Sequence, residues 1–244
     1  MNFLSFMTGV LLTSLFLQAH AQQHKIPVGW RSMGAMPSPT WDGNSLLFSS
    51  DGMKLTVTAI SDEIIRIRCA PEPFFGRKQS YAVAPHDLKE AFVRIEIHSQ
   101  STRMQTRLLR IDIQHDPLRI SIADQHGEML DADDPQRGIS WCDCSFRIAK
   151  RLQMDEHVYG FGQKNGRLDK RGWQLGGYHY TMWNCDTYRF DASTDPTYVS
   201  VPFYIAMRQG KAHGIFLDNT WRSTFDIGRE RQDLLTFGAE GGEL

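Results

Sequence analysis

The stretch LRIDIQHDPLRISIAD (109–124) decides the fold, because it holds two runs of alternating apolar and polar residues on either side of a turn. In both runs, Leu109–Ile113 and Leu118–Ile122, the apolar residues stand two apart. This period is typical of a β-strand with one buried face. Between the runs, His115-Asp116-Pro117 ends the ladder, since proline has no N–H to donate and presets a turn. The stretch therefore predicts a tight antiparallel hairpin.

The same period of two recurs on both sides of this hairpin. It is present at Ile65–Cys69, at Val93–Ile97, and in the runs 201–207 and 212–217, which Gln209-Gly210 joins. No long window outside the N-terminal apolar run repeats with the helical period. Short strands joined by polar turns predict an all-β fold of antiparallel sheets, in one large sandwich rather than two small ones.

The composition excludes several classes of protein. Of the 244 residues, 41% are hydrophobic and 23% charged, which excludes a disordered, collagenous or coiled-coil chain. The 27 Lys and Arg against 28 Asp and Glu give a net charge of −1, so no overall field attracts nucleic acid or anionic lipid. A (β/α)8 barrel alone takes about 250 residues, so a barrel enzyme with a further domain does not fit in this chain.

The first residues have the pattern of a secretory signal. Residues 3–17 are an uncharged, mostly apolar run, and Ala19-His20-Ala21 follows with the small-x-small pattern of a cleavage site. We expect residues 1–21 to be a signal peptide, cleaved after Ala21, and the mature protein to be secreted or periplasmic. The run is shorter than the ~20 residues that span a bilayer, so we expect no membrane segment after cleavage. An uncleaved anchor is the alternative.

The four cysteines, Cys69, Cys142, Cys144 and Cys185, are too few for a disulfide scaffold and include no CxxC pair. Cys142 and Cys144 stand two apart, which on one strand places them on the same face. In an oxidising compartment each is able to reach a different partner. Four cysteines allow three full pairings, and buried free thiols are the alternative.

Residues 155–226 differ from the rest of the chain, because glycine, aromatic residues and aspartate interrupt the apolar alternation. Such a segment predicts long ordered loops, where proteins with a rigid scaffold usually place binding residues. Flat aromatic rings suit the C–H faces of sugars, and packing against the sheet is the alternative for each ring. The aromatic residues concerned are Trp173, Tyr178, Tyr180, Trp183, Tyr188 and Tyr198.

Several short motifs lack the spacing that their chemistry requires. The segment GFGQKNG (160–166) misses the dinucleotide fingerprint, and no helical pattern follows it. The histidines are never at HExxH or HxH spacing, so the sequence predicts no metal site and no cofactor. Asp131, Asp133 and Asp134 resemble the start of a calcium loop but lack its glycine and glutamate. We interpret them as a solvated acidic loop.

Acid and base catalysis by carboxyl groups needs two of them at a defined separation. Asp218-Asn219 and Asp226 most simply cap turns. The candidates considered within residues 155–226 are Asp155, Glu156, Asp186, Asp191, Asp195, Asp218 and Asp226.

Two stretches carry a specific resemblance, VYGFGQKNGRLDKRG (158–172) and MWNCDTYRFDASTDPTYVSVPFYIAMRQGKAHGIFLDNTWRSTFDIG (182–228). The second contains Trp-Asn-x-Asp at 183–186, Asp-Pro-x-Tyr-x-Ser-x-Pro-Phe at 195–203 and Gly-Ile-Phe-x-Asp-Asn at 214–219. On these motifs the chain resembles the N-terminal β-sandwich of glycoside hydrolase family 31, the α-glucosidase and α-xylosidase family.

The resemblance implies a galactose-mutarotase-like supersandwich over residues 22–244, placed before a (β/α)8 barrel. Both catalytic Asp residues of the family lie on that barrel, so we expect no catalytic residue here. We interpret the chain as the N-terminal part of a secreted α-glycosidase that acts on an α-linked oligosaccharide or glycoside. The resemblance also implies that Asp186 binds the hydroxyls of the substrate, with Asn184 and Trp183 orienting it.

Two positions depart from the family motif. Gln163 stands where the family usually has Glu, and Thr197 where it usually has Leu. Gln163 thereby removes a charge from its loop.

Other functions remain open at this point. One alternative is a stand-alone sandwich that binds an α-glycan or delivers an unlinked barrel subunit. Another is an aldose-epimerase-type enzyme, whose chemistry needs a His and Glu pair in an open sugar groove, and analogy of fold alone does not supply that pair. For Asp186 itself, capping of its own loop is the alternative role.

Overall fold

The computed structural model describes residues 29–50, 52–71, 75–76, 80–83, 91–172, 176–189 and 191–244. Over these residues the protein is all-β, with eighteen strands and no helix. Every pairing of neighbouring strands is antiparallel. The all-β antiparallel prediction is confirmed. The expected signal peptide and Trp173 lie outside the described residues.

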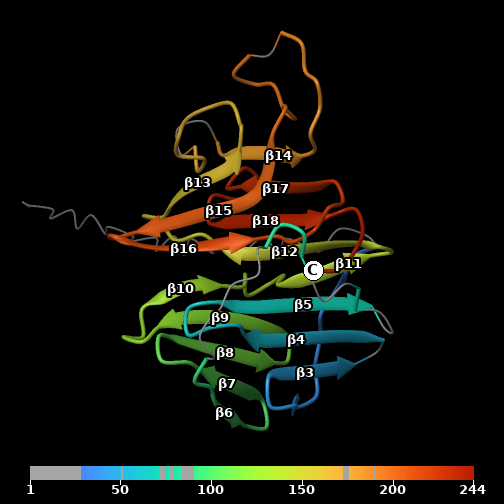
Figure 1. Ribbon diagram of the computed structural model, residues 1–244, viewed down its shortest axis with the longest axis vertical. Helices are drawn as coiled ribbons and strands as arrows, with labels where there is room; N and C mark the ends of the chain where they lie inside the picture. The colour runs from blue at the N-terminus through green and yellow to red at the C-terminus, as the bar shows by residue number, and fades with distance from the viewer. Residues whose placement is uncertain are drawn as a thin grey trace, which may run out of the picture.

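Two sheets form the upper part of the molecule in Figure 1. The six-stranded sheet has the order β1-β11-β12-β18-β17-β14, and the three-stranded sheet has the order β13-β15-β16. The strands of the first are β1 (Arg31–Ser32), β11 (Ile139–Cys142), β12 (Ser145–Arg151), β18 (Leu234–Ala239), β17 (Ser223–Ile227) and β14 (Tyr178–Met182). Those of the second are β13 (His157–Gly162), β15 (Ser200–Arg208) and β16 (Lys211–Phe216).

The other two sheets form the lower part of the molecule (Figure 1). The five-stranded sheet runs β10 (Met129–Ala132), β9 (Leu118–Asp124), β8 (Leu109–His115), β7 (Ser101–Gln105) and β6 (Arg94–Ile97). The four-stranded sheet runs β2 (Thr40–Trp41), β3 (Ser45–Ser50), β4 (Met53–Ala59) and β5 (Ile65–Pro71).

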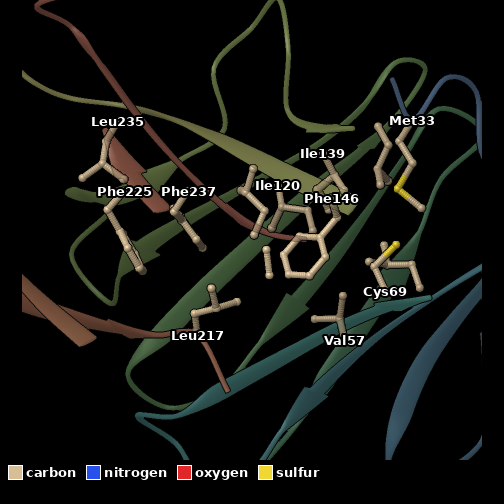
Figure 2. Close-up of a cluster of buried hydrophobic side chains, with 14 of the residues drawn as sticks. Met33, Val57, Cys69, Ile120, Ile139, Phe146, Leu217, Phe225, Leu235 and Phe237 are labelled. Carbon is tan, nitrogen blue, oxygen red and sulfur yellow. The ribbon is translucent and has the colours of Figure 1, made fainter. Parts of the chain in front are cut away.

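One hydrophobic core joins the four sheets. Figure 2 shows Phe225 and Phe237 of the six-stranded sheet near Leu217, with Ile120 and Val57 of the two lower sheets in the same cluster. The rings of Phe225 and Phe237 stack with their centroids 5.3 Å apart. Each of these five side chains is at most 3% exposed. Burying a side chain of this size contributes about 1.5–3 kcal/mol, so the shared core holds the sheets together.

Both hairpins expected from the sequence are present. His115 pairs with Leu118, which leaves Asp116-Pro117 as a two-residue turn between β8 and β9. Arg208 pairs with Lys211 between β15 and β16. The turn residues there, Gln209 and Gly210, have φ of 49° and 76°. Positive φ at both positions is the type I′ turn that suits the twist of a hairpin.

The interpretation of residues 131–134 as a solvated acidic loop is wrong. Asp133 and Asp134 are 7% and 1% exposed. Lys150 Nζ lies 2.5 Å from Asp131 Oδ2 and 2.9 Å from Asp133 Oδ1, and Arg231 pairs with Asp134. Buried carboxylates require such partners, and here the cations come from positions distant in sequence.

The prediction that Cys142 and Cys144 share one strand face is also wrong. Cys142 ends β11 and Cys144 lies in the turn before β12. All four cysteines are free thiols. Burial raises the pKa of the Cys69 thiol to about 12, whereas Cys144 is exposed.

Candidate functional site

The loop between β14 and β15, residues 183–199, carries Trp183, Asn184 and Asp186. It projects beyond β14 at the top of the molecule in Figure 1. The resemblance therefore assigns substrate contact to a segment that projects away from the sheets.

A buried lysine closes the base of this loop. The side chain of Lys164 is 0% exposed, and its Nζ donates to Asp195 Oδ1 at 2.9 Å and to the carbonyl oxygen of Thr181 at 2.6 Å. Asp195 Oδ2 accepts a hydrogen bond from Thr181 N at 2.5 Å. Thr181 lies in β14 and Asp195 on the returning side of the loop, so these bonds join its two ends. A buried ion pair needs such additional hydrogen bonds to offset its desolvation.

Ser200, the first residue of β15, links this base to Trp183 and Asn184. Its Oγ lies 3.5 Å from Lys164 Nζ and accepts from Trp183 N at 3.1 Å. Its N donates to Asn184 Oδ1 at 2.7 Å. The side-chain oxygen of Asn184 therefore holds the loop, while its NH2 group has no partner among the residues described.

The backbone on both sides of Asp186 is fixed to the returning segment. Cys185 N donates to the carbonyl oxygen of Thr197 at 3.2 Å, and Thr187 Oγ1 donates to that of Pro196 at 3.1 Å. These bonds restrict the positions that the Asp186 side chain can reach.

Asp186 differs from the other carboxylates of this region. It is exposed, and its carboxylate has no hydrogen-bond partner in the described part of the chain. The capping alternative requires a bond to its own loop, and none is present there. Each of the other candidates accepts a hydrogen bond from the protein; they are Asp155, Glu156, Asp191, Asp195, Asp218 and Asp226.

The turn-capping prediction is confirmed for Asp226 and for Asn219, whose Oδ1 accepts from the backbone N of Trp221 at 2.8 Å, and it is wrong for Asp218. Asp226 Oδ1 accepts from the backbone N of Arg229 and of Glu230, each at 3.1 Å. Asp218 Oδ1 instead accepts from Ser80 Oγ at 2.8 Å, a residue from a distant part of the chain.

The aromatic residues divide into two groups. Tyr178 and Tyr180 stack with centroids 5.4 Å apart, and the Tyr180 hydroxyl donates to the carbonyl oxygen of Asn165 at 2.8 Å. Burial raises the pKa of Tyr180, so the hydroxyl stays a donor. These two rings therefore pack within the protein, which is the alternative to stacking on a sugar. The exposed rings are Trp183, Tyr188 and Tyr198, at 50%, 82% and 40%.

The two positions that depart from the family motif contact each other. Thr197 is 1% exposed, and its Oγ1 donates to the carbonyl oxygen of Gln163 at 2.5 Å. Gln163 N donates to the carbonyl oxygen of Val199 at 2.9 Å. The Gln163 loop is thus held through its backbone, and its exposed side chain takes no part in these bonds.

Two further observations concern only the residues described. No group of three or more His, Cys, Asp or Glu side chains is placed to hold a metal ion. No helix has the length and apolarity to cross a membrane.

Comparisons with known proteins agree with the motifs. The family pattern "Glycosyl hydrolase 31 N-terminal galactose mutarotase-like domain" matches residues 54–226. Alpha-glucosidase 2 of Bacillus thermoamyloliquefaciens is 35% identical over 192 residues, which are 75% of this chain and 22% of that protein. An alpha-xylosidase of Lactiplantibacillus pentosus is 26% identical over 160 residues, 62% of this chain and 19% of that protein.

Solved structures share the fold. A family 31 dextranase of Flavobacterium johnsoniae in complex with isomaltotriose has a TM-score of 0.78 at 29% identity, over 87% of this chain and 26% of that chain. The cycloalternan-forming enzyme of Listeria monocytogenes, in complex with a pentasaccharide substrate, has a TM-score of 0.71 at 20% identity, over 86% and 20%. The prediction of a galactose-mutarotase-like sandwich is confirmed. The chain spans 22% or less of the length of the curated relatives it matches.

Proposed function

Because the chain belongs to glycoside hydrolase family 31, as the N-terminal galactose mutarotase-like domain of that family, we propose that it is one domain of a secreted α-glycosidase. In this proposal it packs on the catalytic barrel and supplies a loop that contacts the substrate, an α-linked glucoside or xyloside. The curated relatives include two α-glucosidases and an α-xylosidase. Retaining hydrolysis uses two carboxyl groups about 5 Å apart, which the barrel provides.

One observation carries the substrate-contact role: Asp186 is an exposed carboxylate without a partner in the described chain, on a backbone fixed at both sides. Hydrogen bonds to a charged acceptor are worth about 1.5–3 kcal/mol. The free NH2 group of Asn184 and the exposed ring of Trp183 add a donor and a stacking surface in the same loop.

The outer face of the β13-β15-β16 sheet supports attachment to the barrel. Along β15, Val201, Ile205 and Met207 are 40%, 40% and 38% exposed. The register places Gly214 opposite Ile205, and Phe216, 39% exposed, opposite Phe203, so these residues share one face. A continuous exposed apolar face is typical of an interface. We assign it to the catalytic barrel, since the relatives are several times longer than this chain.

The test of the substrate-contact role uses a hybrid enzyme, in which residues 22–244 precede the barrel of the Bacillus relative. Asp186→Asn is expected to lower kcat/KM by about ten- to a hundred-fold, at about 1.4 kcal/mol per decade, with the melting temperature unchanged. Asp191→Asn is the matched control, because Asp191 is exposed in the same loop but accepts from Ser193 N and Oγ. An unchanged kcat/KM for Asp186→Asn eliminates the role.

The isolated chain is expected to hydrolyse no aryl α-glycoside and to be poorly soluble, because its apolar face is uncovered. Replacing Ile205 by Glu and Met207 by Lys is expected to raise its solubility and to weaken attachment in the hybrid. Turnover by the isolated chain that is abolished by a substitution within it refutes the inactivity. Binding of isomaltotriose by the isolated chain, lost in Trp183→Ala, favours the stand-alone glycan-binding module instead.

Secretion rests on the sequence alone. The apolar run 3–17 and Ala19-His20-Ala21 support export with cleavage after Ala21. N-terminal sequencing of exported protein is expected to begin at Gln22, and a mature form that retains Met1 contradicts the proposal.

A further inference from the structure

A hollow of about 340 Å³ lies on the solvent face of the five-stranded sheet, across β7, β8, β9 and β10. One cross-strand row forms part of its floor: Arg103 is opposite Asp112, Asp112 opposite Ser121, and Ser121 opposite Ala132. The two small side chains at one end of this row leave the space open.

The neighbouring row completes the floor. Ser101 is opposite Gln114, and Gln114 is opposite Arg119. Arg103 and Arg119 therefore stand at opposite corners, two strands and two residues apart. With about 4.8 Å between strands and about 3.4 Å per residue, their Cα atoms are separated by roughly 12 Å.

Both guanidinium groups are anchored yet keep N–H groups for a ligand. Arg103 Nε donates to Asp112 Oδ1 at 2.6 Å. Arg119 Nε donates to the carbonyl oxygen of Pro135 at 3.1 Å, and its Nη1 to that of Leu118 at 2.6 Å. Both Nη groups of Arg103 and Nη2 of Arg119 have no partner in the described chain, nor do the hydroxyls of Ser101 and Ser121.

The formal charges of the lining balance, because Arg103 and Arg119 stand against Asp112 and Asp133, so what the hollow offers an anion is the N–H groups of the two arginines that have no partner among the described residues. Asp112 is shared, because Arg110 Nε donates to its second oxygen at 2.9 Å. The other carboxylate of the lining, Asp133, pairs with Lys150, which it shares with Asp131. No aromatic ring lines the hollow, so a neutral sugar finds no stacking surface there.

We propose that this hollow binds a carboxylate-bearing sugar, a hexuronate residue of an acidic glycan. Guanidinium groups match a carboxylate with paired, charge-assisted hydrogen bonds. The serine hydroxyls and Gln114 Oε1 suit the sugar hydroxyls. The site is distinct from the loop of Asp186, whose own carboxylate repels an acidic sugar.

The experiment titrates residues 22–244 carrying the solubilising substitutions Ile205→Glu and Met207→Lys, neither of which lines the hollow. The ligand is glucuronate, with glucose and acetate as comparison ligands, and binding is followed by calorimetry or NMR. Glucuronate is expected to bind at least about ten-fold more tightly than either, and more weakly at high salt, since screening reduces charge pairing. Arg103→Gln and Ala132→Leu are each expected to weaken it by about ten-fold, or 1.4 kcal/mol. Ala132→Leu fills the hollow without removing a charge or a side-chain hydrogen bond.

Arg222→Gln is the matched control, because it removes one positive charge from an exposed arginine that pairs with Glu240 and does not line the hollow. It is expected to leave glucuronate affinity unchanged, and thermal melts report whether each variant is folded. Equal affinity for acetate overturns the sugar part of the proposal, and equal affinity for glucose overturns the ionic part. An Arg222→Gln loss equal to that of Arg103→Gln, or an unaffected Ala132→Leu, overturns the location.

Discussion

Lys150 and Lys164 are both buried lysines paired with aspartate, but the two pairs hold different parts of the molecule. Lys150 lies in β12 between two carboxylates, Asp131 and Asp133, which belong to β10 and the residue after it. Lys164 lies outside any strand and meets one carboxylate, Asp195, with the remaining contacts made by neutral oxygens. The ion pairs of Lys150 join the six-stranded sheet to the five-stranded sheet, whereas the ion pair of Lys164 holds the β14–β15 loop closed.

The number of paired carboxylates determines how many negative charges remain without a cation when the lysine is replaced. Without Lys150, Asp131 and Asp133 face each other without a cation, and Asp133 has only the N–H of Ile120 as a further donor. Burial already raises the pKa of Asp133, which shows that its environment disfavours the charged form. Without Lys164, Asp195 still accepts the N–H of Thr181 and is partly exposed. We therefore expect a global effect at Lys150 and a local one at Lys164.

The largest effect is expected for Lys150→Met. The free energy of unfolding should fall by about 3–5 kcal/mol, the usual cost of leaving buried charges without their partner. Urea unfolding of the variant and the wild type measures it. Adding Asp131→Asn and Asp133→Asn removes the uncompensated charges, and should recover part of the loss. A decrease below about 1 kcal/mol contradicts the assignment of this pair to the sheet interface.

A smaller global effect is expected for Lys164→Met, about 1–3 kcal/mol, from the loss of its hydrogen bonds. The distinguishing result is local: trypsin cleavage after the exposed Arg189, in the β14–β15 loop, should be faster by about ten-fold under conditions in which the protein stays folded. Lys150→Met is the control and should leave this cleavage unchanged at low temperature. If both variants accelerate cleavage equally, Lys164 does not act on the loop specifically.

The same two lysines mark how far the sequence alone reaches. Alternation in β12 places Lys150 on the same face as Phe146 and Ile148, which are 8% and 4% exposed, so a lysine at a core position was readable. Its partners were misinterpreted, because the acidic residues were assigned to a solvated loop. The hairpins and the family were readable from local alternation and motifs. The role of Lys164 could not be predicted from the sequence, because its partner Asp195 lies in an irregular loop distant in sequence. Pairing across loops leaves no periodic signal.

Acid is expected to weaken the Lys150 region more than the Lys164 loop, through His213. Burial, together with the Lys150 charge, lowers the pKa of His213, while Asp131 opposes this. The folded state therefore holds this imidazole neutral where the unfolded chain protonates it. The stabilisation is present above the unfolded pKa and is lost as pH falls below about 6.5.

Stability measured between pH 7 and pH 5 tests this expectation. His213→Gln should flatten the pH dependence of the free energy of unfolding, since the variant no longer carries the titrating group. Trypsin cleavage after Arg189 should change little over the same range. An unaltered slope in His213→Gln assigns the acid sensitivity to other groups.

The smallest effect on stability is expected for Asp186→Asn, and this prediction separates the anchored part of the loop from its exposed part. Asp186 accepts no hydrogen bond from the described chain, so its replacement should change the free energy of unfolding by no more than about 0.5 kcal/mol. Asp195→Asn in the same loop loses the ion pair with the fully buried Lys164 and should cost about 1–3 kcal/mol. Urea unfolding of both variants measures the difference. A loss above about 1 kcal/mol for Asp186→Asn means that its carboxylate supports the fold, and the substrate-contact proposal then loses its premise.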